Sequence, residues 1–253
     1  MIVTANRHAS EAGREMLRGG GSATDAAIAA QLVLGLVEPQ SSGLGGGAFL
    51  LHWDKARGAL DAYDGRETAP AAAQPDRFLR DGQPMPFETA VSSGLSIGTP
   101  GTVRLLSDVH RVHGKLAWSQ LFEPAIRLAE SGFAVSPRLH ILLRVAGAQS
   151  FDETARRYFF DSFGVPHPIG HILKNPAYAA TLRAIAAQGP AGFYTGSLAE
   201  EMVKAAAAAP NAPGDLTVED LRGYRIEKRA PVCAPYRGHK VCGMGPPSSG
   251  GIA

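Results

Sequence analysis

The sequence predicts an α+β fold, with helices and antiparallel strands drawn from different stretches of the chain. Apolar residues recur at helical spacing over the first 40 residues and again across residues 101–221. Residues 48–63 instead contain two apolar runs joined by a polar turn, and residues 224–243 contain a second such pair. A chain with both kinds of segment packs helices against a sheet, which is the α+β class.

The composition is that of a soluble globular protein, and residues 1–253 are predicted to form a single domain. Hydrophobic residues make up 45% of the chain and charged residues 19%. The net charge of +2 offers no basic surface for a nucleic acid, and the most apolar stretch, 26–37, is too short to cross a membrane. No leader peptide is visible, so the chain as given is expected in the cytoplasm, or in the periplasm or medium if its N-terminus has been shortened.

Two helices account for the first 40 residues. The first has apolar residues at helical spacing between 12 and 17 and ends at the glycines 19–21. Ser22 and Asp25 have the spacing of a capping pair, which predicts that a second, alanine-rich helix begins there. That helix is expected to end at residue 37 and to be buried on most sides.

The next segment is predicted to be a hairpin preceded by a glycine cluster. Residues 48–53 and 58–63 are expected to pair, and the hairpin then delivers the charged segment 64–68 at its end. The polar, proline-rich stretch 69–91 is predicted to be a loop with one short helix near Phe78.

Beyond residue 100 the chain is predicted to be mainly helical until two final strands. The expected helices are 103–109, 121–129, 137–145, 176–187, 197–209 and 218–221. Strands at 224–232 and 240–243 are expected to flank a turn at 236–238.

No cofactor or metal site is predicted. The glycine run 43–48 satisfies the loose dinucleotide fingerprint, but a helix precedes it and a strand follows it, which is the reverse of the required order. The pairs His110/His113 and His167/His171 have spacings that could hold a metal on a helix, yet no carboxylate accompanies them as in a metalloprotease. His110 and His113 are expected on a solvated helix face.

Ser96 is the strongest local candidate for a nucleophile. It lies in Gly94-Leu95-Ser96-Ile97-Gly98, the pattern of a nucleophile elbow, and Asp215 and His239 follow in the order Ser, Asp, His. However, Thr99-Pro100-Gly101 separates Ser96 from the helix that an elbow requires, so an ordinary loop is favoured.

Cys233 and Cys242 lie on opposite arms of the predicted terminal hairpin and could face each other. Two thiols in a cytosolic chain are usually free, and free thiols are expected here.

Arg66 is a candidate binding residue because it follows the first hairpin among small and polar residues. A guanidinium can bind a carboxylate through two parallel hydrogen bonds. Considered locally, an ion pair with Glu67 or Asp64 at the surface is the favoured alternative.

Several segments together resemble the γ-glutamyltranspeptidase family, which comprises glutathione hydrolases and related cephalosporin acylases among the N-terminal nucleophile hydrolases. The resemblance covers almost the whole chain, with the order and spacing of the segments kept. The segments that carry it are 9–13, 19–27, 38–49, 64–70, 98–101, 192–196, 220–221 and 246–251.

The resemblance implies a four-layer αββα sandwich and a proenzyme that cleaves itself into a large and a small subunit. The nucleophile would be the N-terminal threonine of the small subunit, with its own α-amino group as base, and the acyl group would pass through a γ-glutamyl-enzyme. All the matching motifs belong to the large subunit, and the Thr-Thr-His segment that opens the small subunit is not among the 253 residues. The chain is therefore expected to be the N-terminal part of a large subunit, inactive without its small-subunit partner.

The resemblance assigns one residue a role in substrate binding. Arg66 stands where the family has the arginine that pairs with the α-carboxylate of the γ-glutamyl group, whereas Ser96 becomes an incidental loop residue and the two cysteine positions are not linked. The expected substrates are glutathione and other γ-glutamyl amides. Three alternatives remain: a glutaryl-type cephalosporin acylase, an inactive chain that acts as an assembly partner, and a serine hydrolase that uses Ser96. Arg66 favours the γ-glutamyl reading over the acylase because a glutaryl group has no α-amino acid end.

Overall fold

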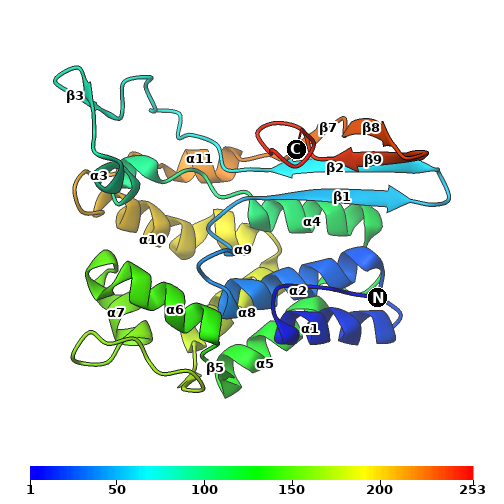
Figure 1. Ribbon diagram of the computed structural model, residues 1–253, viewed down its shortest axis with the longest axis horizontal. Helices are drawn as coiled ribbons and strands as arrows, with labels where there is room; N and C mark the ends of the chain where they lie inside the picture. Colours follow the sequence, from blue (N-terminus) through cyan, green and yellow to red (C-terminus); the bar gives the residue numbers. More distant parts are fainter. Residues whose placement is uncertain (253) are drawn as a thin grey trace.

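The computed structural model describes residues 1–252, and its core lies between stacked helices and one face of a three-stranded sheet (Figure 1). Helices α1 (Arg7–Arg18) and α2 (Ala23–Val37) pack side by side, as the sequence predicts. Ser22 Oγ accepts a hydrogen bond from the Asp25 N–H at 3.1 Å, and Asp25 Oδ2 accepts from the Ser22 N–H at 2.7 Å. The predicted capping pair is therefore confirmed.

Asp25 also connects α2 to a distant part of the chain. Its side chain is fully buried, and Oδ2 accepts from the backbone N–H groups of Lys115 and Leu116 at 3.0 and 3.2 Å. These residues follow α4 (Thr102–His113), so one carboxylate holds the start of α2 against the end of α4.

The sheet has the order β1-β2-β7. Strands β1 (Ala48–Asp54) and β2 (Ala59–Gly65) form the predicted antiparallel hairpin, and β7 (Glu227–Arg229) pairs with the other edge of β2. Helix α4 lies against β2, so one face of the sheet is covered by helices (Figure 1). Because β2 ends at Gly65, the chain leaves the sheet just where Arg66 follows.

Together with α4, the remaining elements include a helix at or near each position where a helix is predicted beyond residue 100. They are α3 (Phe87–Val91), α5 (Glu123–Ser131), α6 (Pro137–Ala146), α7 (Glu153–Phe159), α8 (Pro176–Gln188), α9 (Ala191–Tyr194), α10 (Gly196–Ala207), α11 (Val218–Gly223), the 3₁₀ turns η1 (Gly94–Ser96), η2 (Trp118–Phe122) and η3 (Ala148–Ser150), and the short strands β3 (Leu79–Arg80), β4 (Gln83–Pro84), β5 (Phe133–Ala134) and β6 (Ile172–Leu173). Helices α7 and α9 were not predicted. Within residues 1–252, no helix is both long and apolar enough to span a membrane.

The short helix expected near Phe78 is wrong in position. Strands β3 and β4 form a small hairpin there, because Asp81 and Gly82 both adopt positive φ angles, 52° and 75°, which suit a tight two-residue turn. The helix occurs later, as α3.

The C-terminal strands also differ from the prediction. The expected strand 224–232 is divided: its middle joins β2 as β7, and its last residue begins β8 (Val232–Tyr236), which pairs with β9 (His239–Gly243). In that register Cys233 lies directly opposite Cys242, with Cα atoms 4.1 Å apart, and the two form a disulfide. The expectation of free thiols is therefore wrong, because it rested on compartment and family position, whereas the hairpin register brings the two sulfurs together.

Candidate functional site

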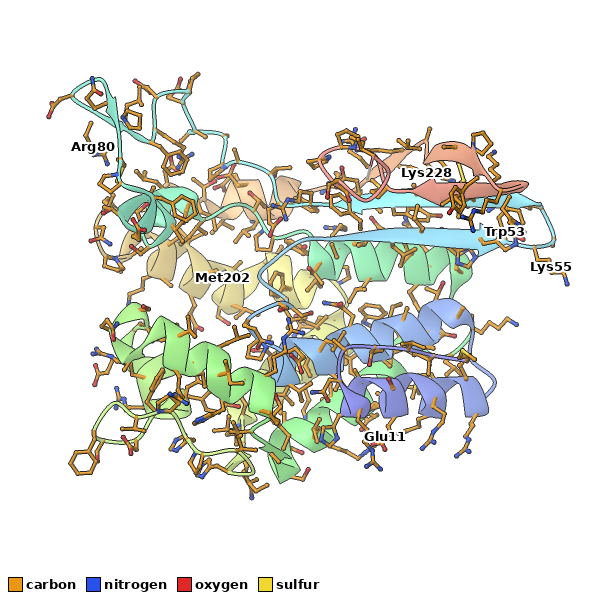
Figure 2. All side chains as sticks on the ribbon, in the orientation of Figure 1. Glu11, Trp53, Lys55, Arg80, Met202 and Lys228 are labelled. Atoms are coloured by element: carbon orange, nitrogen blue, oxygen red, sulfur yellow. A yellow bond between two sulfur atoms is a disulfide. The ribbon has the colours of Figure 1, made fainter. Side chains whose placement is uncertain are left out.

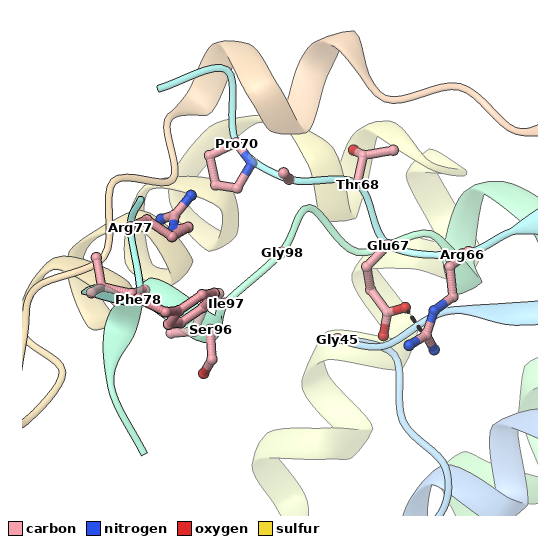
Figure 3. A pocket seen from close by; sticks show the side chains of 12 residues that line it. Gly45, Arg66, Glu67, Thr68, Pro70, Arg77, Phe78, Ser96, Ile97 and Gly98 are labelled. Carbon is pink, nitrogen blue, oxygen red and sulfur yellow. Dashed lines mark ion pairs between the residues drawn. The ribbon is translucent and has the colours of Figure 1, made fainter. Parts of the chain in front are cut away.

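A cleft of about 460 Å³ opens where the chain leaves the sheet after β2 (Figure 3). Four segments line it: the glycine cluster, residues 66–70, residues 77–78, and residues 95–98, which include part of the turn η1. The lining residues are Gly45, Arg66, Glu67, Thr68, Ala69, Pro70, Arg77, Phe78, Leu95, Ser96, Ile97 and Gly98. Arg66 is thus part of the wall of a concave site.

The backbone of Arg66 is fixed from both sides while its side chain stays accessible. Its N–H donates to Asp64 Oδ1 at 2.8 Å, and the Tyr224 hydroxyl donates to its carbonyl oxygen at 2.7 Å. Asp64 is itself buried and accepts from Arg229 Nε at 2.6 Å. The Arg66 side chain remains 58% exposed, so a fixed backbone presents a guanidinium that a ligand can reach.

Glu67 gives the cleft a negative group beside that cation. Its Oε2 lies 3.2 Å from Arg66 Nη1, an ion pair without hydrogen-bond geometry, and this oxygen is buried with no donor among residues 1–252. An adjacent cation and anion complement the carboxylate and ammonium of an α-amino acid. The local expectation of an ion pair between Arg66 and Glu67 is met, and the pair is part of the cleft.

Gly47 lies where the backbone leaves no room for a side chain. A Cβ atom at Gly47 would lie 2.6 Å from Glu67 Oε2 and 2.7 Å from the Gly65 carbonyl oxygen. Gly47 therefore lets two backbone segments approach closely at the site, which is a packing role.

Arg77 lies at the other end of the cleft and was not singled out from the sequence. Its Nη2 donates to Asp215 Oδ1 at 2.6 Å, and its side chain is only 11% exposed. The sequence signal was weak because the partner lies 138 positions away.

The structure does not assemble a serine triad. The Ser96 hydroxyl donates to the carbonyl oxygens of Val91 and Ser93 at 2.8 and 2.9 Å, and Ser96 lies in η1 rather than between a strand and a helix. Asp215 pairs with Arg77, and His239 pairs with Tyr236 at the β8–β9 turn. Among residues 1–252, neither Asp215 nor His239 is hydrogen-bonded to Ser96, which lines the cleft. This agrees with the interpretation of Ser96 as an ordinary loop residue.

The histidine pairs do not form a metal centre. Within residues 1–252, no group of three or more His, Cys, Asp or Glu side chains is placed to hold a metal ion. The solvated face expected for His110 and His113 is wrong, since both are partly buried. His113 stacks on His52 with ring centroids 3.8 Å apart and lies 2.7 Å from the Tyr63 hydroxyl; burial, followed by the neighbouring His52, lowers the pKa of His113.

Comparisons of sequence and fold relate the chain to known proteins. A family model described as Gamma-glutamyltranspeptidase matches residues 9–253. The chain is 37% identical to Glutathione hydrolase 3 of Arabidopsis thaliana over 253 residues, an alignment that covers 100% of this chain and 38% of that relative. It is 35% identical to the Glutathione hydrolase proenzyme of Bacillus subtilis over 253 residues, an alignment that covers 100% of this chain and 42% of that relative. The fold matches the crystal structure of Helicobacter pylori gamma-glutamyltranspeptidase with a TM-score of 0.91 and 35% identity, over 98% of this chain and 70% of that one. The chain spans about two fifths of the length of these curated relatives.

Proposed function

The chain belongs to the γ-glutamyltranspeptidase family, and from this we propose that it forms the N-terminal part of the large subunit of an enzyme that transfers or hydrolyses γ-glutamyl groups. The substrates are glutathione and related γ-glutamyl amides. Support comes from the family match over residues 9–253 and from the names of the relatives, which are glutathione hydrolases. The single observation that carries the proposal is the placement of Arg66 in the wall of a cleft. The family resemblance implies that an arginine at this position pairs with the substrate carboxylate.

The proposed reaction needs a nucleophile from a second subunit of the same precursor. The threonine hydroxyl at that subunit's N-terminus attacks the γ-carbonyl, and the α-amino group takes the hydroxyl proton and passes it to the departing amine. Water or an amino acid then accepts the γ-glutamyl group from the enzyme. The Bacillus subtilis relative is named a proenzyme, which fits such a precursor. Without the small subunit, the 253 residues are proposed to be inactive.

Arg66 is proposed to bind the α-carboxylate of the γ-glutamyl group. Its fixed backbone and exposed guanidinium suit a bidentate contact, and Glu67 stands beside it for the α-ammonium group. A γ-glutamyl group carries both charges, whereas a glutaryl group carries only a carboxylate.

The test is the Arg66→Lys variant in the processed two-subunit enzyme. Lysine keeps the charge but loses the planar fork, so KM for a γ-glutamyl anilide is expected to rise about tenfold or more, with a smaller effect on kcat. Arg111→Lys, at an exposed position of α4, is the matched control and should leave KM unchanged. Equal KM values for the wild type and Arg66→Lys would remove Arg66 from the binding site, and preferential cleavage of a glutaryl anilide by the wild type would favour the acylase alternative.

We also propose that the protein works in an oxidising compartment, the exported alternative left open by the sequence. The support is the Cys233–Cys242 disulfide, a bond that persists mainly outside the cytoplasm. Alkylation of the unreduced protein, taken directly from cells, should leave both cysteines unmodified; labelling of both would place it in a reducing compartment.

A further inference from the structure

The cleft has a guanidinium at each end. Figure 3 shows Arg66 and Arg77 on opposite sides of the opening, with Glu67 and Gly98 between them. A ligand that spans this cleft would present one end to each cation. Two separated cations favour a ligand with two separated anionic groups over one with a single anionic end.

We propose that Arg77 binds the C-terminal carboxylate of a γ-glutamyl peptide, at the end opposite the α-carboxylate held by Arg66. The inference rests on the proposed function, because that function supplies the peptide. The ligand class is a short peptide with a carboxylate at both ends, and Arg77 would make the enzyme prefer such peptides over γ-glutamyl amides whose leaving group is uncharged.

The hydrogen bonding of Arg77 leaves donors for a ligand. Within the described residues, only Nη2 has an acceptor, Asp215 Oδ1, so Nη1 is the donor left for a ligand, while Nε is buried without an acceptor. A buried guanidinium with unfilled donors is destabilised until an acceptor reaches it. The side chain is held nearly 90% buried in the wall of the cleft, so it is already ordered before a carboxylate arrives.

The ion pair between Arg77 and Asp215 could also serve only to hold two segments together, so the test must distinguish this structural role from substrate binding by Arg77. This ion pair connects the 69–91 region to the segment before α11, near the point where the Gly94 N–H donates to the Ala212 carbonyl oxygen at 2.8 Å. If Arg77 served only as this connection, loss of either partner would have the same effect. If Arg77 binds substrate, loss of Asp215 removes a competing carboxylate and leaves the binding cation in place.

The experiment compares glutathione with its C-terminal amide as donors for the processed enzyme. The two share the γ-glutamyl group, so the ratio of their kcat/KM values reports only the C-terminal carboxylate. The wild type is expected to favour the acid, and Arg77→Gln should reduce this preference by about tenfold. Arg77→Lys, which keeps a point charge in case the glutamine variant folds poorly, should lose part of the preference. Asp215→Asn is the matched control and should retain it.

The possible results separate this proposal from the proposed function. If Arg77→Gln and Arg77→Lys leave the ratio unchanged, or if Asp215→Asn lowers it as much as Arg77→Gln does, Arg77 is only a structural connection and the proposal fails, while cleavage of both donors upholds the proposed function. A wild-type enzyme that cleaves neither donor overturns both.

Discussion

Asp61 on β2 is held by two cations on the sheet. Its side chain is 10% exposed, Oδ1 lies 2.7 Å from Lys228 Nζ on β7, and Oδ2 contacts Arg57 from the β1–β2 turn. Hydrogen bonds from Lys228 and then Arg57 lower the pKa of Asp61 from 3.8 to about 2. The carboxylate therefore contributes to stability only while it is ionised.

The pH dependence of this contribution has a definite sign. Because the pKa is lower in the folded state, the stabilisation is complete above about pH 4 and is lost as the pH falls towards about 2. Asp61→Asn should be less stable than the wild type at pH 7, and the difference should shrink across that interval in unfolding experiments. A difference that stays constant from pH 6 to pH 2 would show that the ion pairs contribute nothing. Since both cations are about half exposed, added salt should also reduce the difference.

The single residues of the site differ in how far the sequence could predict them. The position of Arg66 follows from the family resemblance, although its role in binding stays a prediction. Arg77 could not be predicted, because its importance depends on a partner 138 positions away and on a cleft formed by four separate segments. Local sequence encodes the chemistry of a side chain but not which distant groups surround it.

The start of α2 shows how one side chain supports an element. Asp25 completes the capping box with Ser22 and also accepts two backbone N–H groups from the segment after α4. Loss of this carboxylate would leave three backbone N–H groups without their acceptor, whereas loss of the Ser22 hydroxyl would leave one.

Asp25→Ala and Ser22→Ala are therefore expected to differ in stability. Asp25→Ala should cost about 2 to 4 kcal/mol and Ser22→Ala about 1 kcal/mol, measured by chemical unfolding. Similar losses in the two variants would mean that the bonds to Lys115 and Leu116 add little.

Elements with strong local signals could be predicted, and those fixed by distant pairing could not. The apolar run and the capping pair are sufficient to predict α2, and two apolar runs joined by a turn are sufficient to predict β1 and β2. Strand β7 was merged with β8 because nothing local shows that residues 227–229 pair with β2. The disulfide was missed for a related reason, since it depends on the β8–β9 register, which a single residue of slip would change.

At the scale of the whole molecule, the sheet has one covered face and one partly open apolar face. Leu50 packs against the core and His52 contacts Thr24 of α2, so these β1 residues face the helices. The alternate residues Leu51 and Trp53 are 39% and 59% exposed. Trp53 lies near Lys55 at the turn end of the hairpin (Figure 2). In a four-layer sandwich the second sheet packs on this face.

Trp53→Asp should therefore weaken assembly with the proposed small subunit. The charge would be buried between the two sheets, so the yield of the paired subunits in size-exclusion chromatography should fall severalfold. Val112→Asp is the control, because Val112 is 62% exposed on α4 and lies outside that face. Equal yields from both variants would show that the second sheet does not cover Trp53.

The pairing of β2 with β7 has a consequence for the order in which the protein forms on the ribosome. Arg229, which bonds to Asp64, is synthesised 165 positions later. At a synthesis rate of roughly 5 to 20 residues per second, one edge of β2 stays unpaired for about 8 to 30 s before β7 has been synthesised. During that interval the nascent chain exposes an unpaired strand edge next to the segment that carries Arg66, and the Arg66 carbonyl oxygen lacks its hydrogen bond from Tyr224, which is synthesised 158 positions later.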